Sequence, residues 1–156
     1  MKAASRKAHE NRLDSRINLF GYKRVKVMPD GACQFRALAY QDRGEEELHA
    51  EIRASVIDQM VNFPECYKTY AEVGCTWDEY IEEMSREGTW GDHITLQAFA
   101  DAFGVCVKLI SSYDVQDESY IIDVTPREGV EYERNNWLVL AFSAEVHYDA
   151  LMPEAI

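Results

Sequence analysis

A change in hydrophobic period near Gly104 is the feature that most restricts how this chain can fold. Before that residue, apolar side chains recur at helical spacing, most clearly at Leu48, Ile52, Val56 and Met60. After it, short runs of β-branched and aromatic residues are separated by turn residues, which is typical of strands. A chain with its helices early and most of its strands late is expected to form an α/β domain.

Local signals set the limits of the expected elements. Thr76 and Glu79 fit a capping box, Asp92 suits the start of a further helix, and Gly104 suits that helix's end. We expect helices over residues 5–20, 33–41, 45–63, 76–86 and 94–103. We expect strands over residues 22–28, 105–111, 119–124, 137–142 and 146–151.

Length and composition indicate one domain with one active site, since 156 residues at 47% apolar content suffice for a single core. We divide the chain into a basic helical segment, residues 1–21, that packs on or leads into the domain, and the domain itself, residues 22–156.

Charge is unevenly distributed along the chain. The net charge is −12, but residues 1–29 hold eight Lys or Arg against two acids, which leaves the other 127 residues at −18. A polyanion gains counterion-release energy from basic surfaces, so nucleic acid is not an expected partner of the acidic body. The acidity favours a basic partner, or it serves only to keep the domain soluble.

Several other features bear on compartment and chemistry. The longest uncharged stretch, residues 135–144, is about half of what a membrane-spanning helix needs, so no membrane partner is expected. The first 16 residues contain no apolar stretch of a secretory signal, which favours a cytoplasmic or nuclear protein. The four cysteines form no C-x-x-C pair, so we expect free thiols and no zinc ribbon.

Cys33 is a candidate nucleophile. It follows Asp30-Gly31-Ala32 at a strand-to-helix turn, where the positive end of the helix dipole stabilises a thiolate. Free backbone amides at the same helix start can bind a developing oxyanion. The alternative is a buried core cysteine without chemistry.

A nucleophilic cysteine needs a histidine base, and the chain has four histidines. We expect His9 and His49 to be solvated on their helices and His93 to cap or pack at a helix start. His147 lies in an expected strand, and Asp149 shares its face because side chains at i and i+2 point the same way. An ordinary surface pair is the alternative for these two residues.

Three ordered segments resemble motifs of one family. They are the stretch 30–37 (DGACQFRA), the stretch 88–98 (GTWGDHITLQA), and the pair formed by 137–140 (WLVL) and 145–149 (EVHYD). Together they resemble the signatures of ovarian-tumour (OTU) domain cysteine proteases, most closely the plant-type proteins, over residues 13–153.

The resemblance implies a central mixed β-sheet flanked by helices and hydrolysis of the isopeptide bond after the C-terminal glycine of ubiquitin. It implies Cys33 as nucleophile and His147 as base, with no metal or organic cofactor. Asp149 and Asp30 are both candidates for orienting the histidine, and strand geometry favours Asp149. Ubiquitin or polyubiquitin is the implied partner.

The same resemblance suggests substrate-binding residues. Backbone amides around Gly31 and Ala32 are expected to bind the oxyanion, and Trp90 and Gly91 are expected to line the channel for the ubiquitin tail, although a tryptophan packed in the core is an equal alternative.

Two positions depart from the common pattern. Ala32 stands where the family usually has asparagine, and Asp149 stands where many members have asparagine; neither is expected to prevent activity. Three alternatives remain: a pseudoenzyme that only binds ubiquitin, a protease for a ubiquitin-like modifier, and a scaffold domain whose motifs serve packing.

Overall fold

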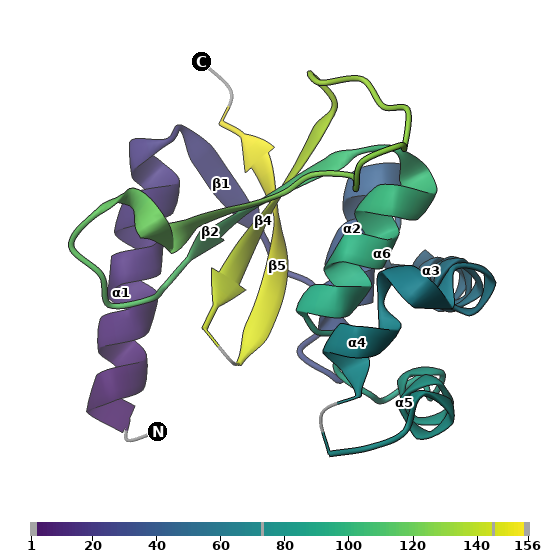
Figure 1. The fold of residues 1–156 in the computed structure, drawn as a ribbon. Coiled ribbons are helices and arrows are strands. Elements are labelled where there is room, and N and C mark those ends of the chain that lie inside the picture. Colours follow the sequence, from purple (N-terminus) through teal and green to yellow (C-terminus); the bar gives the residue numbers. More distant parts are fainter. Residues whose placement is uncertain (1–2, 73, 145, 155–156) are drawn as a thin grey trace.

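A mixed β-sheet forms the middle layer of the molecule (Figure 1). In the computed structural model, which describes residues 3–72, 74–144 and 146–154, the sheet has the order β1-β5-β4-β2-β3. Strands β2 and β4 are parallel, and the other neighbouring pairs are antiparallel. The strands are β1 (Tyr22–Val25), β2 (Cys106–Ser111), β3 (Ile121–Val124), β4 (Trp137–Ser143) and β5 (His147–Pro153).

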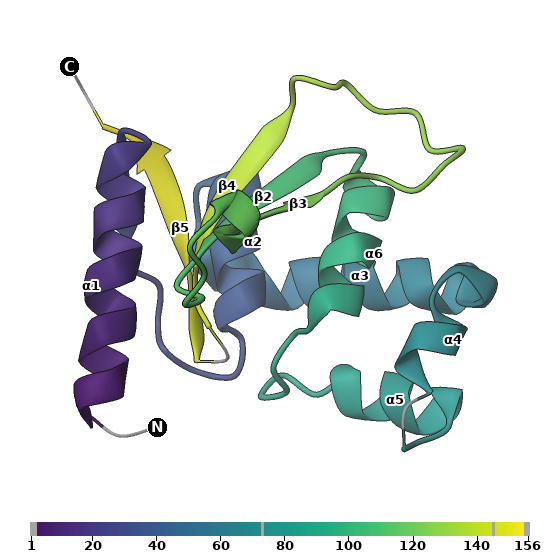
Figure 2. The same cartoon turned by 60° about the vertical axis from the view of Figure 1, so that its left-hand side comes forward.

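Helices cover both faces of this sheet. Helix α1 (Ala3–Leu19) lies alone along one face, as Figure 2 shows from the side. Helices α2 (Cys33–Arg43), α3 (His49–Asn62) and α6 (His93–Phe103) lie on the other side, and the short α4 (Lys68–Ala71) and α5 (Trp77–Met84) lie farther out. Three 3₁₀ turns complete the described elements: Glu46–Leu48, Pro64–Cys66 and Glu118–Tyr120.

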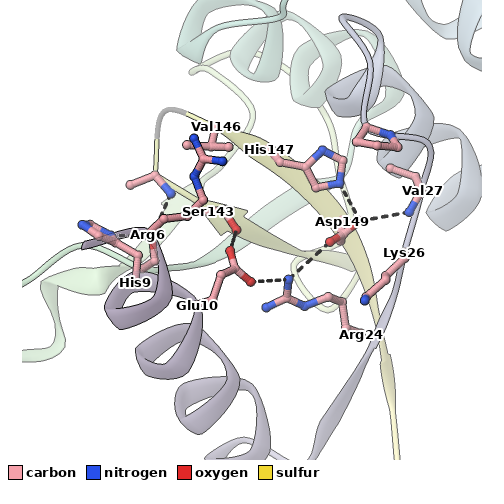
Figure 3. A pocket seen from close by; sticks show the side chains of 13 residues that line it. Arg6, His9, Glu10, Arg24, Lys26, Val27, Ser143, Val146, His147 and Asp149 are labelled. Carbon is pink, nitrogen blue, oxygen red and sulfur yellow. Dashed lines mark hydrogen bonds and ion pairs between the residues drawn. The ribbon is translucent and has the colours of Figure 1, made fainter. Parts of the chain in front are cut away.

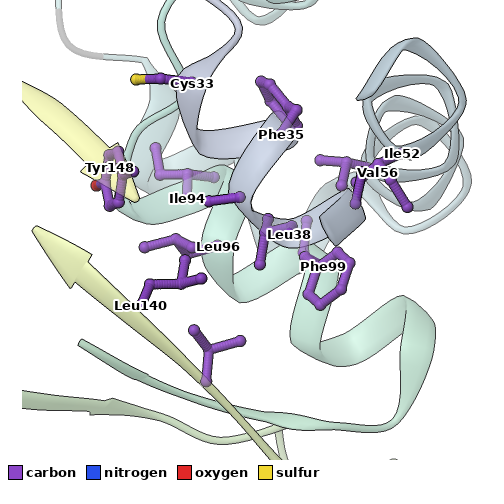
Figure 4. Close-up of a cluster of buried hydrophobic side chains, with 14 of the residues drawn as sticks. Cys33, Phe35, Leu38, Ile52, Val56, Ile94, Leu96, Phe99, Leu140 and Tyr148 are labelled. Atoms are coloured by element: carbon purple, nitrogen blue, oxygen red, sulfur yellow. The ribbon is translucent and has the colours of Figure 1, made fainter. Parts of the chain in front are cut away.

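Alternation along the strands divides the core in two. Val107 and Leu109 of β2 belong to the larger cluster with α2, α3 and α6, whose packing around Leu38 and Phe99 is visible in Figure 4. Ile110 packs instead with Leu13 of α1 in the smaller cluster. Because successive side chains of a strand point to opposite faces, each sheet face receives its own helices.

Polar contacts hold α1 on the sheet, in addition to the apolar packing of its residues Leu13 and Ile17. Arg16 donates to the carbonyl oxygens of Ser111 and Tyr113, each at 2.8 Å, and Arg12 donates to the carbonyl of Ser112 at 2.7 Å. The basic helix is therefore bound to the end of β2 by several charged hydrogen bonds.

The expected α/β class and mixed sheet are confirmed, and so are the local caps. Thr76 and Asp92 both make capping boxes, and Gly104 ends α6 in the left-handed conformation at φ 62°. The expected strand 22–28 is too long: it ends at Val25, because the N–H of Val27 donates to the Asp149 carboxylate and Pro29 follows. The expected strand 119–124 begins as a 3₁₀ turn, and α4 was not expected.

Two histidines are more buried than expected. His9 is half-buried, with Nδ1 3.2 Å from the Ser112 hydroxyl, and the His49 side chain is buried beside Glu87. The expectation of solvated side chains was wrong because it followed their charged neighbours. Their spacing was the better guide, since His9 lies four residues before buried Leu13 and His49 three before buried Ile52.

Among the residues that the structure describes, no helix has the length and apolar character needed to cross a bilayer.

Candidate active site

Cys33 is the first residue of α2. Its side chain is almost fully buried, and in Figure 4 its sulfur points away from Phe35 of the core. No side chain caps this helix start, so the N-terminal peptide dipoles of α2 act on the thiol. Cys33 thus lies at the helix start that the strand-to-helix turn predicted, and its role as nucleophile stays a prediction.

Asp30 organises the loop before the cysteine. Its carboxylate accepts hydrogen bonds from the Arg36 guanidinium at 2.9 to 3.1 Å and from the N–H of Ala32 at 3.0 Å. The N–H of Cys33 donates to the Asp30 carbonyl at 3.1 Å. The hydrogen bonds from Arg36, more than any other contact, hold the pKa of Asp30 below its ordinary value. Asp30 therefore shapes the loop, and its carboxylate is committed to Arg36.

His147 and Asp149 lie side by side on β5. The ring Nε2 of His147 donates to Asp149 Oδ1 at 2.8 Å, and the same oxygen accepts the Val27 N–H at 2.9 Å (Figure 3). Asp149 is buried, whereas the histidine is only partly covered. The i, i+2 relation on a strand therefore places the expected carboxylate on the expected histidine.

The charge state of His147 follows from its two partners. Burial alone would lower the pKa of its imidazole, but hydrogen bonds with Asp149 and Cys33, together with their negative charges, outweigh burial and raise the pKa to about 9. The imidazole is therefore protonated at neutral pH when it faces a thiolate. Cys33, His147 and Asp149 form a connected series of thiol, ring and carboxylate.

The segments 30–37 and 88–98 are in contact behind the cysteine. A Cβ at Gly31 would lie only 1.8 Å from the carbonyl oxygen of Gly88, and a Cβ at Gly91 would lie 2.3 Å from the side-chain oxygen of Gln34. Gln34 also donates to the Asp92 carbonyl at 3.0 Å. Gly31 is needed for the close approach of the two backbones, whereas a Cβ at Gly91 would displace the end of the Gln34 side chain.

Two hollows flank the histidine strand. One, of about 270 Å³, is lined by aromatic and aliphatic residues and includes Trp90, Gly91 and Tyr148, and the Tyr148 ring stacks on Phe142 at 4.5 Å between ring centroids. The other, of about 400 Å³, lies between α1 and β5 and includes Arg24, His147 and Asp149 (Figure 3). Trp90 is half exposed at the first hollow, as a channel-lining side chain would be.

Comparison with known proteins decides the family. The sequence matches the model of the OTU-like cysteine proteases over residues 28–149, which is most of the chain. The chain belongs to the OTU-like cysteine protease family. The family membership inferred from the three motifs is thereby confirmed.

Individual relatives agree with this family. The chain is 40% identical over 143 residues to the OVARIAN TUMOR DOMAIN-containing deubiquitinating enzyme 10 of Arabidopsis thaliana, covering 92% of this chain and 38% of that protein. It therefore spans well under half of that relative's length. Its fold resembles the solved OTUD1 OTU domain, with a TM-score of 0.78 at 20% identity over 97% of this chain and 99% of that one. An ovarian tumor domain solved in complex with ubiquitin has a TM-score of 0.66 at 20% identity. That comparison covers 84% of this chain and 69% of the solved one.

Two residues connected to Asp149 lie outside the family match of this OTU-like protease. Arg24 of β1 and Glu10 of α1 both lie before residue 28, yet Arg24 reaches Asp149 and Glu10 binds Arg24. Sequence reasoning missed both residues. The alternation of basic and apolar residues in the stretch 22–28 placed Arg24 on a sheet face, but nothing local indicated which strand would lie beside it.

Among the described residues, no group of three or more His, Cys, Asp or Glu side chains is arranged to hold a metal ion.

Proposed function

We propose that this domain is a deubiquitinating cysteine protease that hydrolyses the isopeptide bond after the C-terminal glycine of ubiquitin. The observation that carries the proposal is the series formed by Cys33 at the start of α2 with His147 and Asp149 of β5, in which the ring-to-carboxylate distance is 2.8 Å. The Arabidopsis relative named as a deubiquitinating enzyme and the related domain solved with ubiquitin support the choice of substrate.

In this mechanism the Cys33 thiolate attacks the carbonyl carbon of the glycine. The resulting tetrahedral intermediate expels the lysine amine, which takes a proton from the imidazolium of His147, and a thioester to Cys33 remains. Neutral His147 then removes a proton from water, whose oxygen attacks the thioester and releases the carboxylate of ubiquitin. Asp149 holds the ring so that its other nitrogen faces the sulfur.

The negative oxygen of the intermediate needs hydrogen-bond donors near the cysteine loop. The amides of Ala32 and Cys33 already donate to Asp30, whereas the Gly31 amide has no hydrogen bond within the described chain. Gly31 N–H is therefore the first donor in this proposal. Ala32 N–H joins it when its bond to the Asp30 carboxylate is exchanged for the oxyanion.

In this proposal the ubiquitin tail enters along the hollow of about 270 Å³ beside Trp90. Trp90 and Gly91 line that hollow, which ends at Tyr148 beside the histidine. The apolar lining suits the C-terminal glycine of the tail, and Asp92 at the same hollow suits a basic side chain upstream. The net charge of −12 favours the approach of such a basic tail.

The test is covalent capture with a ubiquitin probe whose C-terminus bears a thiol-reactive group. Wild-type chain should form one adduct, and Cys33→Ala should form none while keeping its melting temperature. Binding of ubiquitin without any adduct would show a pseudoenzyme and refute the proposed activity. Probes built on ubiquitin-like proteins and a panel of diubiquitins, run in parallel, report the modifier and the linkage.

The chain is also proposed to work in ubiquitin-conjugate turnover in the cytoplasm or nucleus. All four cysteines are free thiols, which suits a reducing compartment. Imaging of the tagged protein would test the compartment, and a secreted, disulfide-linked product would contradict it.

A further inference from the structure

The two oxygens of Asp149 have different partners. Oδ1 accepts from the ring of His147 and from the N–H of Val27. Oδ2 faces Nη1 of Arg24 at 3.5 Å. Since the carboxylate is buried, each oxygen needs a partner, and the partner of Oδ2 determines how the carboxylate is turned toward the histidine.

Strand register explains why Arg24 meets Asp149. Arg24 of β1 pairs with Leu151 of β5, and Asp149 lies two residues before Leu151 on the same face. That face is the one that α1 covers, because Leu151 packs with Leu13 of α1. The side of the active site remote from the cysteine is thus closed by the N-terminal helix.

Helix α1 holds Arg24 by two carboxylates. Arg24 Nη1 donates to Glu10 at 3.0 Å, and Nη2 donates to Asp14 at 2.8 Å (Figure 3 shows the first of these bonds). Glu10 in turn accepts a hydrogen bond from the hydroxyl of Ser143. Burial would raise the pKa of Glu10, but the bonds from Ser143 and Arg24 outweigh it and keep the pKa below its ordinary value. Glu10 is therefore ionised at neutral pH.

We propose that Arg24 is a positioning residue for the catalytic histidine, acting through Asp149, and that Glu10 and Asp14 make α1 part of the catalytic unit. The inference rests on the proposed hydrolase function for its kinetic test. It extends the working site to residues 10–24, which lie outside the family match at 28–149.

Replacing Arg24 should therefore affect the chemical step more than binding. In Arg24→Gln, Oδ2 of Asp149 loses its cationic partner and the carboxylate is free to turn away from the ring. We expect kcat to fall about 10- to 100-fold, the loss typical of a misplaced catalytic group. KM should change little, because the ubiquitin tail enters by the hollow beside Trp90 in the proposed function and Arg24 does not line that hollow.

The direction of change in the pKa of His147 separates positioning from other roles. If Arg24 acted only as a positive charge, its removal would raise the pKa of His147 above about 9. If it acted only in folding, the pKa would not move in the folded variant. If it positions Asp149, the pKa should fall, because the ring loses its carboxylate even as a cation is removed.

The experiment combines steady-state kinetics on ubiquitin fluorogenic amide with NMR titration of the histidine rings, assigned with His147→Gln. The matched control is Arg16→Gln, which also loosens α1 but touches the carbonyls of Ser111 and Tyr113 and not Asp149. We expect a lower kcat and a lower His147 pKa in Arg24→Gln, partial recovery of kcat in Arg24→Lys, and neither change in Arg16→Gln.

A folded Arg24→Gln with unchanged kcat and unchanged or raised His147 pKa would overturn the inference, and so would an equal kcat loss in Arg16→Gln. Should Arg24→Gln not fold, Glu10→Gln provides the test, with a smaller loss in the same direction, and no loss there would overturn it. Absence of turnover in the wild-type chain would instead count against the proposed function, while the titration, which needs no substrate, would still decide the role of Arg24.

Discussion

Replacing Asp149 by alanine should separate the two candidate orienting carboxylates. The change removes the hydrogen bond that the His147 ring makes at 2.8 Å. A hydrogen bond to a charged group contributes about 1.5 to 3 kcal/mol, so kcat should fall about 10- to 150-fold. The pKa of His147 should also fall from about 9, since Asp149 is one of the two groups that raise it.

The same substitution should cost stability. Val27 N–H loses its acceptor at 2.9 Å, and an unsatisfied buried amide costs about 1 to 3 kcal/mol. Asp149→Asn should keep more kcat, because an amide oxygen can still accept from the ring. Its amide nitrogen would then face Nη1 of Arg24, so two donors would meet and stability should still fall.

The assay is kcat on ubiquitin fluorogenic amide at pH 7.5, with urea unfolding of each variant to confirm that the protein is folded. Asp30→Asn serves as the comparison, and it should keep the loop bond from Ala32 and most of the activity. A fully active Asp149→Ala together with an inactive Asp30→Ala would refute the reasoning and exchange the two roles.

Three further outcomes are expected. Gly31→Ala should lower the melting temperature and abolish probe labelling, because its Cβ would overlap the Gly88 carbonyl; normal labelling would contradict the close approach. The raised pKa of His147 contributes stability that is fully present below its unfolded value near 6.5 and is lost as pH rises through about 9. Urea midpoints should therefore fall over that range in wild type and fall less in His147→Gln, and identical slopes would exclude this ring as the cause. Rising salt should lower kcat/KM for ubiquitin substrates while kcat changes little, and a salt-independent kcat/KM would remove the electrostatic steering argument.

Several features of the fold could be predicted from short stretches of sequence. The capping residues Thr76 and Asp92 act within their own turns, so four consecutive residues are enough to predict them. The relation of His147 to Asp149 is equally local, because strand geometry alone puts i and i+2 on one face. For these caps and for this pair, the local prediction was correct.

Contacts between residues that are far apart in sequence could not be predicted from local signals. The expected strand 22–28 looked continuous because its alternation is regular, but Val27 lies beside a carboxylate from the other end of the chain. The contact of Arg24 with Asp149 depends on which strand pairs with β1, and the bond to Glu10 depends on which face α1 covers. His9 was misplaced for a different reason, because charged neighbours were weighed above helical spacing.

The long separation in sequence between Cys33 and β5 has a consequence for when the proposed active site can form. Cys33 is synthesised before the ring and carboxylate of β5, which lie more than a hundred residues farther along the chain. Contacts so distant in sequence form slowly, because a long loop must close before they are gained. A nascent chain that contains Cys33 but not yet β5 therefore carries this thiol without His147 and Asp149. The proposed hydrolysis needs β5, so a chain truncated before His147 should not react with the ubiquitin probe.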